Sequence, residues 1–205
     1  MHNILYLFIT HQKKLKSTIE RISNMMNNLQ CSDYLIICGS DKNELCIEDK
    51  ILFISCNDNY EGLPEKIIKT FSFIINNNNF DNYTHFCKLD DDMIINELLK
   101  YDEIKNYNYC GNAHYYNEGN RFWHVGRCSS NSKYNNTPYK GIYVHWCLGG
   151  YGYIISRFAI NEIQNNNDFD NHIYEDLYIA ILLKNKNILP LPFNIRKYII
   201  SPEHK

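Results

Sequence analysis

The stretch HFCKLDDDMIIN, residues 85–96, places three adjacent carboxylates at the end of an apolar run typical of a buried strand. Neighbouring carboxylates repel one another, and a divalent cation is the simplest partner that relieves this repulsion. Because carboxylate oxygens are hard ligands, the run favours Mn²⁺ or Mg²⁺ over a thiolate-seeking metal. The alternative is a solvated acidic turn without a ligand, as most short Asp runs are.

Apolar strands alternate with amphipathic helices before this run. The pattern predicts strands at residues 4–9, 34–38, 51–55 and 84–89 and helices over residues 15–29 and 63–75. Such alternation indicates an α/β fold with a parallel sheet, in which ligands bind beyond the carboxyl ends of the strands. Thr10, Asp41 and the acidic run each follow a predicted strand. We therefore expect a nucleotide and a metal at this edge of the sheet.

The pattern changes after residue 100. Strands are predicted at residues 107–111, 142–146 and 188–191, with a glycine-rich bend at 147–153 and helices at 158–164 and from residue 176 onward. Residues 112–137 are polar, aromatic and irregular. A stretch of this length without regular structure is usually disordered or functional. Its many aromatic side chains favour a functional loop.

Length and composition bound the class of protein. The chain has 205 residues, of which 44% are hydrophobic, and this predicts one domain with a sizeable core. A net charge of −2 without a Lys/Arg-rich block gives no reason to expect nucleic acid. None of the eight cysteines forms a CxxC pair, so no zinc site is expected. The N-terminal apolar run has no basic leader and is too short to span a bilayer. We therefore expect a soluble, cytoplasmic protein without a signal peptide or membrane anchor.

Four segments, taken in order, resemble the fringe and β-1,3-galactosyltransferase-like family of glycosyltransferases. NYEGL (59–63) with Lys69-Thr70 is similar to the family's Tyr-x-x-Leu-x-x-Lys-Thr segment, and KLDDD (88–92) with Ile95-Asn96 is similar to its acidic motif. CLGGYGYIIS (147–156), after Pro138-Tyr139, resembles its Pro-Tyr-Cys-x-Gly-x-Gly-Tyr-Val-x-Ser segment, and EDLYI (175–179) resembles its Glu-Asp-Val-Tyr block. The family's Arg-rich segment after the first strand is replaced here by residues 11–14, HQKK.

The resemblance covers roughly residues 50–185. It implies the GT-A fold of nucleotide-diphospho-sugar transferases, a single Rossmann-like domain over residues 1–205 with a central mixed, mostly parallel sheet. Residues 1–100 are then the nucleotide-sugar-binding half, and residues 101–205 are the acceptor-binding and catalytic half. The implied reaction is an inverting, Mn²⁺- or Mg²⁺-dependent transfer from a UDP-sugar to a hydroxyl of a glycan or glycoprotein, which forms a β linkage.

The resemblance also assigns metal ligands. The last Asp of the family's acidic motif binds the metal, and Asp92 takes that position here. Asp90 points the same way along a strand and is expected to reach the metal or the ribose. Asp91 points to the other face, which favours a structural role, although it stays among the candidate cofactor-binding residues. A C-terminal His often completes the metal shell in this fold class, and His204 is placed to do so. A frayed tail residue is the alternative for His204.

Asp176 is the candidate base, because it matches the Asp of the family's Glu-Asp block. A helix dipole would keep its carboxylate ionised at a helix start, where an ordinary helix cap is the alternative role. Glu175 is expected to orient the acceptor or to cap the same helix.

Further candidate contacts to the donor are Thr10, Lys88, Gly149 and Gly150. Glycines let a backbone approach a sugar closely, unless they only form a tight bend. Lys69 and Lys88 are candidates for phosphate contacts, or else lie on solvated faces. Trp123 and Trp146 are expected either to stack on sugar rings or to pack in the core.

Two other functions fit parts of the sequence. A metal-dependent phosphoesterase would use the acidic run, but the chain has no second acidic or His cluster for a two-metal site. A non-catalytic sugar-binding module would keep the fold without the chemistry. The presence of both the acidic run and Asp176 favours an enzyme. Donor sugar, acceptor and linkage depend on the geometry of residues 112–137, and the oligomeric state does not follow from the sequence.

Overall fold

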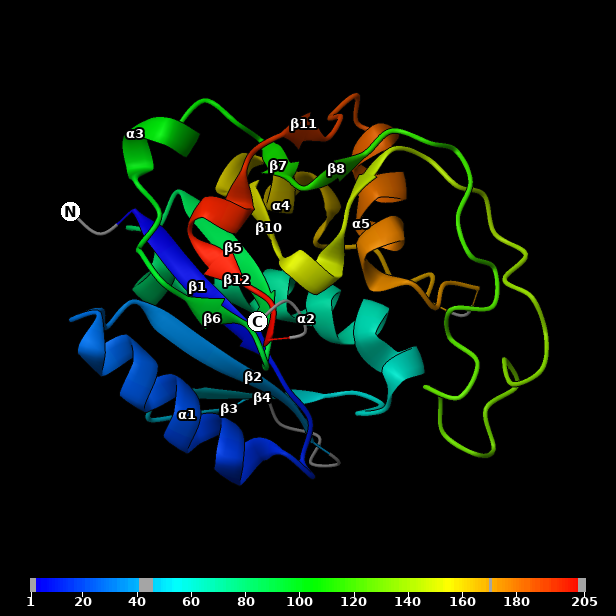
Figure 1. Cartoon of the computed structure of the whole chain (residues 1–205), viewed down its shortest axis with the longest axis horizontal. Helices are drawn as coiled ribbons and strands as arrows, with labels where there is room; N and C mark the ends of the chain where they lie inside the picture. The colour runs from blue at the N-terminus through cyan, green and yellow to red at the C-terminus, as the bar shows by residue number, and fades with distance from the viewer. Residues whose placement is uncertain (1–2, 41–45, 170, 203–205) are drawn as a thin grey trace.

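The computed structural model describes residues 3–40, 46–169 and 171–202. Among these residues, eight strands form one sheet in the order β11-β7-β10-β5-β1-β2-β4-β3 (Figure 1). In chain order the strands are β1 (Ile4–Ile9), β2 (Tyr34–Ser40), β3 (Cys46–Glu48), β4 (Ile51–Ser55), β5 (His85–Asp90), β7 (Tyr109–Gly111), β10 (Tyr153–Ser156) and β11 (Leu191–Pro192). Four of the seven neighbouring pairs are parallel. The predicted α/β fold with a mixed, mostly parallel sheet is confirmed.

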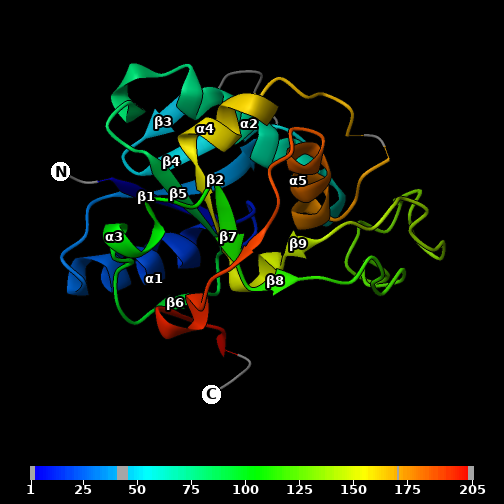
Figure 2. The same ribbon diagram turned by 90° about the horizontal axis from the view of Figure 1, so that it is seen from above.

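Helices cover both faces of this sheet. They are α1 (Leu15–Asn28), α2 (Leu63–Ile75), α3 (Tyr101–Ile104), α4 (Arg157–Ile163) and α5 (Glu175–Lys184). Figure 2 shows α1 and α3 on one face and α2 and α4 on the other. Short 3₁₀ turns lie between them: η1 (Tyr60–Gly62), η2 (Asn78–Phe80), η3 (Gly149–Tyr151) and η4 (Ile195–Lys197). No helix among the described residues combines the length and apolar character that a membrane span needs.

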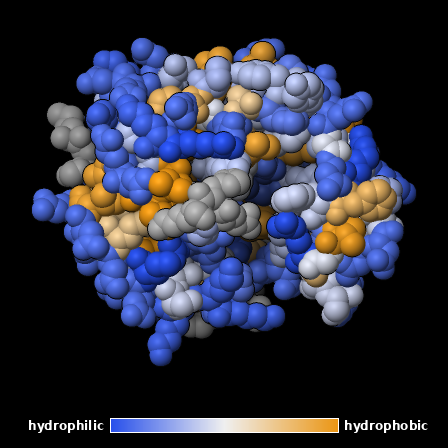
Figure 3. Space-filling model, viewed as in Figure 1, coloured by the Kyte–Doolittle hydropathy of each residue, from blue (hydrophilic) through white to orange (hydrophobic). Residues whose placement is uncertain are grey.

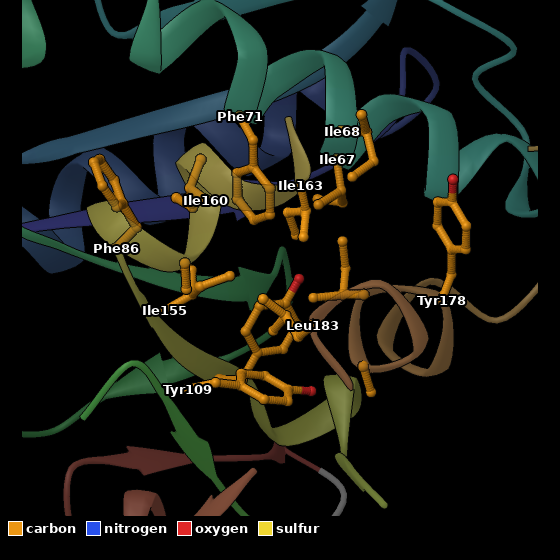
Figure 4. Close-up of a cluster of buried hydrophobic side chains, with 14 of the residues drawn as sticks. Ile67, Ile68, Phe71, Phe86, Tyr109, Ile155, Ile160, Ile163, Tyr178 and Leu183 are labelled. Carbon is orange, nitrogen blue, oxygen red and sulfur yellow. The ribbon is translucent and has the colours of Figure 1, made fainter. Parts of the chain in front are cut away.

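The larger core lies between the sheet and helices α2, α4 and α5 (Figure 4). Phe71 of α2, Ile163 of α4 and Leu183 of α5 point toward one another and are fully buried. Phe86 and Ile155 face them from β5 and β10. Burial of each such side chain contributes roughly 1.5–3 kcal/mol, so this packing fixes α5 against the sheet.

Two small ribbons complete the fold. In one, β6 (Ile94–Ile95) pairs with β12 (Ile199–Ile200), so the segment after the acidic run is held by the C-terminal part of the chain. In the other, β8 (Ala113–His114) pairs with β9 (Trp146–Cys147). This second ribbon closes the base of a long loop, residues 112–146, which we call the insert. The insert extends beyond β8 and β9 as the green to yellow-green loops of Figures 1 and 2.

The predicted elements occur in the predicted order, with two differences. The strand expected at residues 142–146 is wrong except for its last residue, because β9 begins at Trp146. Tyr143 and Val144 are instead buried within an aromatic cluster with Tyr139 and Tyr174. Their apolar pattern therefore reflects side-chain packing and not strand pairing. The expected strand at residues 188–191 is displaced and forms β11 at residues 191–192.

Strand order brings the sequence motifs together. β5 lies between β1, which is parallel to it, and β10, which is antiparallel. Asp90 therefore lies beside Ile9 at the end of β1, and Lys88 lies beside Tyr153 at the start of β10. The acidic run and the glycine-rich bend consequently share the carboxyl edge of the sheet, where ligands of α/β proteins bind.

Candidate active site

A cavity of about 440 Å³ opens at this edge of the sheet. Its walls come from β5, η1, η3, the first turn of α5 and the insert. Eight residues proposed from the sequence line it: Lys88, Asp90, Trp123, Trp146, Gly149, Gly150, Glu175 and Asp176. Residues from both halves of the chain therefore build one site.

Lys88 is the buried cation at the centre of this site. It follows Phe86 by two positions on β5 and so lies on the face of the sheet that α5 covers. Its ammonium group donates to Asp90 Oδ1 at 2.7 Å and pairs with Glu175 Oε2 at 3.0 Å. Burial alone would lower the pKa of Lys88, but the two carboxylates outweigh it and raise the pKa above its usual value. Lys88 therefore stays charged and joins the acidic run to the start of α5.

Glu175 is buried on the other side of this cation. The hydroxyl of Tyr153 donates to Glu175 Oε1, so each carboxylate oxygen has a partner. Burial raises the pKa of Glu175, and the ammonium group of Lys88 opposes that rise. The capping role expected for Glu175 is wrong, because Tyr174 is the N-cap residue of α5. The contacts of Glu175 instead anchor Lys88, a role that was not predicted, and the acceptor-orienting role stays a prediction.

Asp176 faces the cavity from the first turn of α5. Its Oδ2 accepts a hydrogen bond from the Gly149 backbone N–H at 2.8 Å, and its Oδ1 accepts one from the Leu177 N–H at 2.8 Å. Burial raises the pKa of Asp176, the two backbone donors oppose the rise, and the nearby charge of Asp90 adds to it. The carboxylate is thus fixed in position and more basic than one in water.

Gly149 and Gly152 allow η3 to pack this closely. A Cβ built on Gly149 would lie 3.0 Å from Asp176 Cβ, so the absence of a side chain there lets the carboxylate approach the backbone donor. Gly152 has φ +79°, and a Cβ on it would lie 2.6 Å from the Lys88 carbonyl oxygen. A Cβ on Gly150 would meet nothing within 4 Å, which leaves that position open toward the cavity.

The three aspartates of the acidic run lie in different surroundings. Asp90 ends β5, lines the cavity and is 44% exposed. Asp91 turns toward α1: its Oδ2 accepts from the Thr10 hydroxyl, just after β1, at 2.7 Å and from the Thr18 hydroxyl of α1 at 3.4 Å. Asp92 is exposed in the turn that follows and does not line the cavity. Because the strand ends at Asp90, the alternation used to pair Asp90 with Asp92 does not continue past it.

The hydroxyl and the carbonyl of Thr10 are both hydrogen-bonded within the fold. Its side chain is 3% exposed, and its carbonyl accepts from the buried Lys66 ammonium group at 2.8 Å. Lys66 also pairs with Asp58, which accepts from the Gly39 N–H at 2.8 Å. This network joins the carboxyl ends of β1, β2 and β4. Thr10 and Asp91 thus support the edge of the sheet from within and do not line the cavity. Asp41 and His204 lie outside the described residues.

The donor atoms at the edge of the sheet fit a hard divalent cation. Although Asp92 is exposed, its partial desolvation together with the charges of Asp90 and Asp91 raises its pKa, and the charge of Lys14 opposes the rise. Carboxylates suit Mg²⁺ or Mn²⁺, which commonly use one or two protein carboxylates together with water and phosphate oxygens. Among the described residues, no group of three or more His, Cys, Asp and Glu side chains is placed to hold a metal. The fit therefore depends on Asp90 and Asp92.

The insert is held against this site by polar contacts. The buried ring of His124 contacts the Tyr174 hydroxyl at 2.9 Å and the Thr137 carbonyl at 2.9 Å. The Ser129 N–H and hydroxyl both donate to the Glu61 carboxylate of η1. These contacts hold a segment without regular structure against the rest of the fold, and the functional loop expected from its aromatic content stays a prediction.

Residues of the insert form one wall of the cavity. Of these residues, only Trp123 and Trp146 were predicted from the sequence. Trp123 and Trp146 both line the cavity, and Trp123 is 53% exposed whereas Trp146 is 7% exposed. Further residues of the wall are His114, Asn120, Arg127 and Tyr143. No spacing rule identifies them, because an irregular loop places side chains by its own path. The aromatic content of the segment was the available signal.

A larger cavity of about 710 Å³ lies beside α2, away from this chemistry. It is lined by residues such as Ser55, Lys69 and Asn76, and no carboxylate is among the described lining residues. The Lys69 ammonium group is already bound by Glu65 at 2.6 Å and by the Ser55 carbonyl at 2.6 Å. We therefore place the active site in the smaller cavity.

Comparison with known proteins agrees with the resemblance inferred from the motifs. The model of the galactosyltransferase family matches residues 41–192, so this chain belongs to that family. It is similar to UDP-GalNAc:beta-1,3-N-acetylgalactosaminyltransferase 2 of Mus musculus, with 23% identity over 154 residues. That match spans 75% of this chain and 28% of the length of the mouse protein.

Two solved structures are similar to this chain at low identity. One is a protein from STIV, with 12% identity and a TM-score of 0.46 over 95% of this chain and 83% of the other. The second is a Bacillus anthracis protein assigned as a glucose-1-phosphate thymidylyltransferase, with 10% identity and a TM-score of 0.47 over 93% and 87% of the two chains. Neither likeness is close enough to carry a functional conclusion.

Proposed function

We propose that this protein is a metal-dependent, inverting glycosyltransferase that uses a UDP-sugar donor. The acceptor is a hydroxyl of a glycan or glycoprotein, and the product has a β linkage. The observation that supports this function best is the shared cavity of Asp90 and Asp176, one at the end of β5 and the other held by two backbone N–H groups. Membership of the galactosyltransferase family supports it independently.

Asp176 is the proposed base. Its two oxygens each accept one backbone hydrogen bond and keep further lone pairs for a substrate. Because its pKa is raised, it takes a proton more readily than an ordinary Asp while staying fixed in position. A base on the acceptor side implies one direct displacement at the anomeric carbon. An α-linked UDP-sugar therefore gives a β-linked product.

Asp90 and Asp92 are the proposed metal ligands, with His204 as a further proposed ligand. When bound, Mn²⁺ or Mg²⁺ supplies positive charge to the diphosphate leaving group. Lys88 holds Asp90 in place and adds a fixed cation to the same wall of the cavity. The open backbone at Gly150 is proposed to lie against the donor. These residues together orient the donor toward Asp176.

A binding experiment tests the donor and metal parts of this proposal. UDP should bind the full chain in calorimetry with Mn²⁺ present and bind at least about tenfold more weakly in EDTA. Asp92→Ala should abolish the difference, whereas Asp102→Ala, which removes an exposed carboxylate on α3, should leave it unchanged. Equal UDP affinity in EDTA would contradict the metal assignment. Mn²⁺-dependent hydrolysis of UDP-sugars then separates a transferase from a non-catalytic module and identifies the donor.

A further inference from the structure

The insert differs in charge from the rest of the protein. It contains four basic residues and one acidic residue, a net charge of +3 in a chain whose total is −2. Its exposed hydrophobic side chains are Tyr115, Tyr116, Phe122, Trp123, Val125 and Ile142. Figure 3, in the same view as Figure 1, shows hydrophobic atoms among hydrophilic ones on the lobe that the insert forms. A surface that combines aromatic faces with positive charge suits a sugar with an anionic group.

Arg127 brings this charge into the cavity. Its guanidinium group lies 4.1 Å from the ring centroid of Trp123, and both residues line the cavity. Among the described residues, no carboxylate lies within ion-pair distance of Arg127, whereas Lys88, which lines the same cavity, has two. Stacking on Trp123 holds the guanidinium plane in one orientation and leaves its N–H groups for another partner.

Arg127 lines the same cavity as the proposed base, Asp176. Tyr60, a partly buried cavity residue, interacts electrostatically with both Asp176 and Arg127. Burial raises the pKa of Tyr60, the charge of Asp176 adds to the rise, and the charge of Arg127 opposes it. Tyr60, Arg127 and Asp176 all line this cavity, so a sugar bound there would share it with both charged groups.

We propose that the acceptor is a glycan that carries an anionic group, with Arg127 binding that group while Trp123 supports the sugar ring. The inference rests on the proposed function and adds the chemical class of the acceptor. Arg127 is suited to a planar carboxylate or to sulfate or phosphate, because its fork of N–H groups makes paired hydrogen bonds to such oxygens. The Asp176 carboxylate does not exclude an anionic acceptor, since the positive charge of Arg127 lines the same cavity.

Matched saccharides test the proposal with the full chain. Saturation-transfer NMR, with UDP and Mn²⁺ present, compares methyl glucuronide with methyl glucoside, and methyl galactoside 6-sulfate with methyl galactoside. These two pairs distinguish a carboxylate from a sulfate. At least one anionic saccharide should bind about tenfold or more tightly than its neutral partner, on the scale of one charge-assisted hydrogen bond. Arg127→Met should remove that preference, and Arg127→Lys should keep part of it.

Lys133→Met is the matched control, because Lys133 is a cation of the insert that does not line the cavity. It should leave the preference unchanged. No preference in either pair, or a preference that survives Arg127→Met, would overturn the proposal. UDP affinity of Arg127→Met should match that of the original protein, and a loss there would assign Arg127 to the donor and also overturn it. Because donor hydrolysis needs no acceptor glycan, it shows separately whether the proposed function itself fails.

Discussion

Lys88 on β5 and Glu175 at the start of α5 form an ion pair of 3.0 Å in which both side chains are almost fully buried, at 2% and 5% exposure. The pair ties the strand that ends in the acidic run to the helix that carries Asp176. Two residues that are 87 positions apart in sequence thereby fix the distance between the proposed metal ligands and the proposed base. A buried pair of this kind is costly to break on one side, because the remaining charge loses its partner.

Removing one member of this pair should therefore destabilise the fold. We expect Lys88→Met to lower the free energy of unfolding by about 3–5 kcal/mol, the usual cost of leaving one buried charge unpaired. The double variant Lys88→Met/Glu175→Gln should recover much of that loss, because no buried charge remains. Urea denaturation of the original protein, both single variants and the double variant measures the coupling. Strictly additive losses would contradict the pairing.

The base assignment leads to a second prediction. Asp176→Asn removes the negative charge and one of the two acceptor oxygens, so Gly149 or Leu177 loses a hydrogen bond. We expect a change in stability within about 1 kcal/mol, since one bond is lost and a half-buried charge is removed at the same time. The transfer rate should fall about 100-fold or more, the usual scale for loss of a general base. UDP affinity should stay within about twofold.

Kinetics with the identified donor and acceptor, together with the anomeric coupling of the product by NMR, check this prediction. Near-original turnover of Asp176→Asn would reduce Asp176 to a structural carboxylate. An α-linked product from an α-linked donor would rule out a single displacement.

Much of the fold could be predicted from the sequence, because the local spacing of apolar residues matches the face that each element buries. The uniformly apolar strands β1 and β2 are buried on both faces, and the apolar stripe of α2 packs on the sheet. Ser156 accepts from the Ala159 N–H, as expected of an N-cap. In each of these elements the spacing of apolar residues or the chemistry of one cap residue is sufficient to predict the structure.

The site was less predictable, because its contacts join distant segments. The sequence brought Asp90, Asp176 and the glycine-rich bend into one site, but it did not show that Lys88 is buried between two carboxylates. It also did not show that the strand stops at Asp90 and turns Asp91 toward Thr10. Arg127 has no periodic signal at all, since its place depends on the path of an irregular loop held by His124.

The third prediction concerns how the stability of the fold depends on pH through His85, a buried residue at the start of β5. His85 is 4% exposed, its Nε2 lies 3.1 Å from the Tyr107 carbonyl and its Nδ1 lies 3.0 Å from the Thr84 hydroxyl. Burial lowers its pKa below the ordinary 6.5, although the Tyr107 carbonyl opposes the shift. The unfolded chain therefore binds a proton more readily than the folded one. The stability that neutral His85 contributes is present above pH 6.5 and is lost as the pH falls from 6.5 through the folded-state pKa.

NMR titration of the His85 ring checks the sign directly. The midpoint should lie below 6.5 in the folded protein, and His85→Gln should show a weaker decline of the unfolding free energy between pH 7 and pH 5. Part of that decline should remain in the variant, because burial also lowers the pKa of His172. A midpoint at or above 6.5 would contradict the assignment.

Alanine substitutions at the two adjacent glycines of η3, Gly149 and Gly150, should distinguish a residue that supports the fold from one that contacts the substrate. Neither has a positive φ, so alanine is compatible with the backbone at both positions. A Cβ at position 149 would lie 3.0 Å from Asp176 Cβ, whereas one at 150 would face open space. Gly149→Ala should therefore push the Asp176 carboxylate aside and cost about 1–3 kcal/mol, the usual range for an overpacked site. Gly150→Ala should leave the free energy of unfolding unchanged.

Catalysis should separate the same two variants in a different way. Gly149→Ala should lower kcat by about tenfold or more, because a base displaced by a fraction of an ångström loses its alignment with the acceptor hydroxyl. Gly150→Ala should instead raise KM for the UDP-sugar with little change in kcat, because its added methyl group occupies space proposed for the donor. Denaturation and steady-state kinetics measure the unfolding free energy, kcat and KM of both variants. If Gly149→Ala kept full kcat while losing stability, the contact between η3 and Asp176 would serve the fold alone.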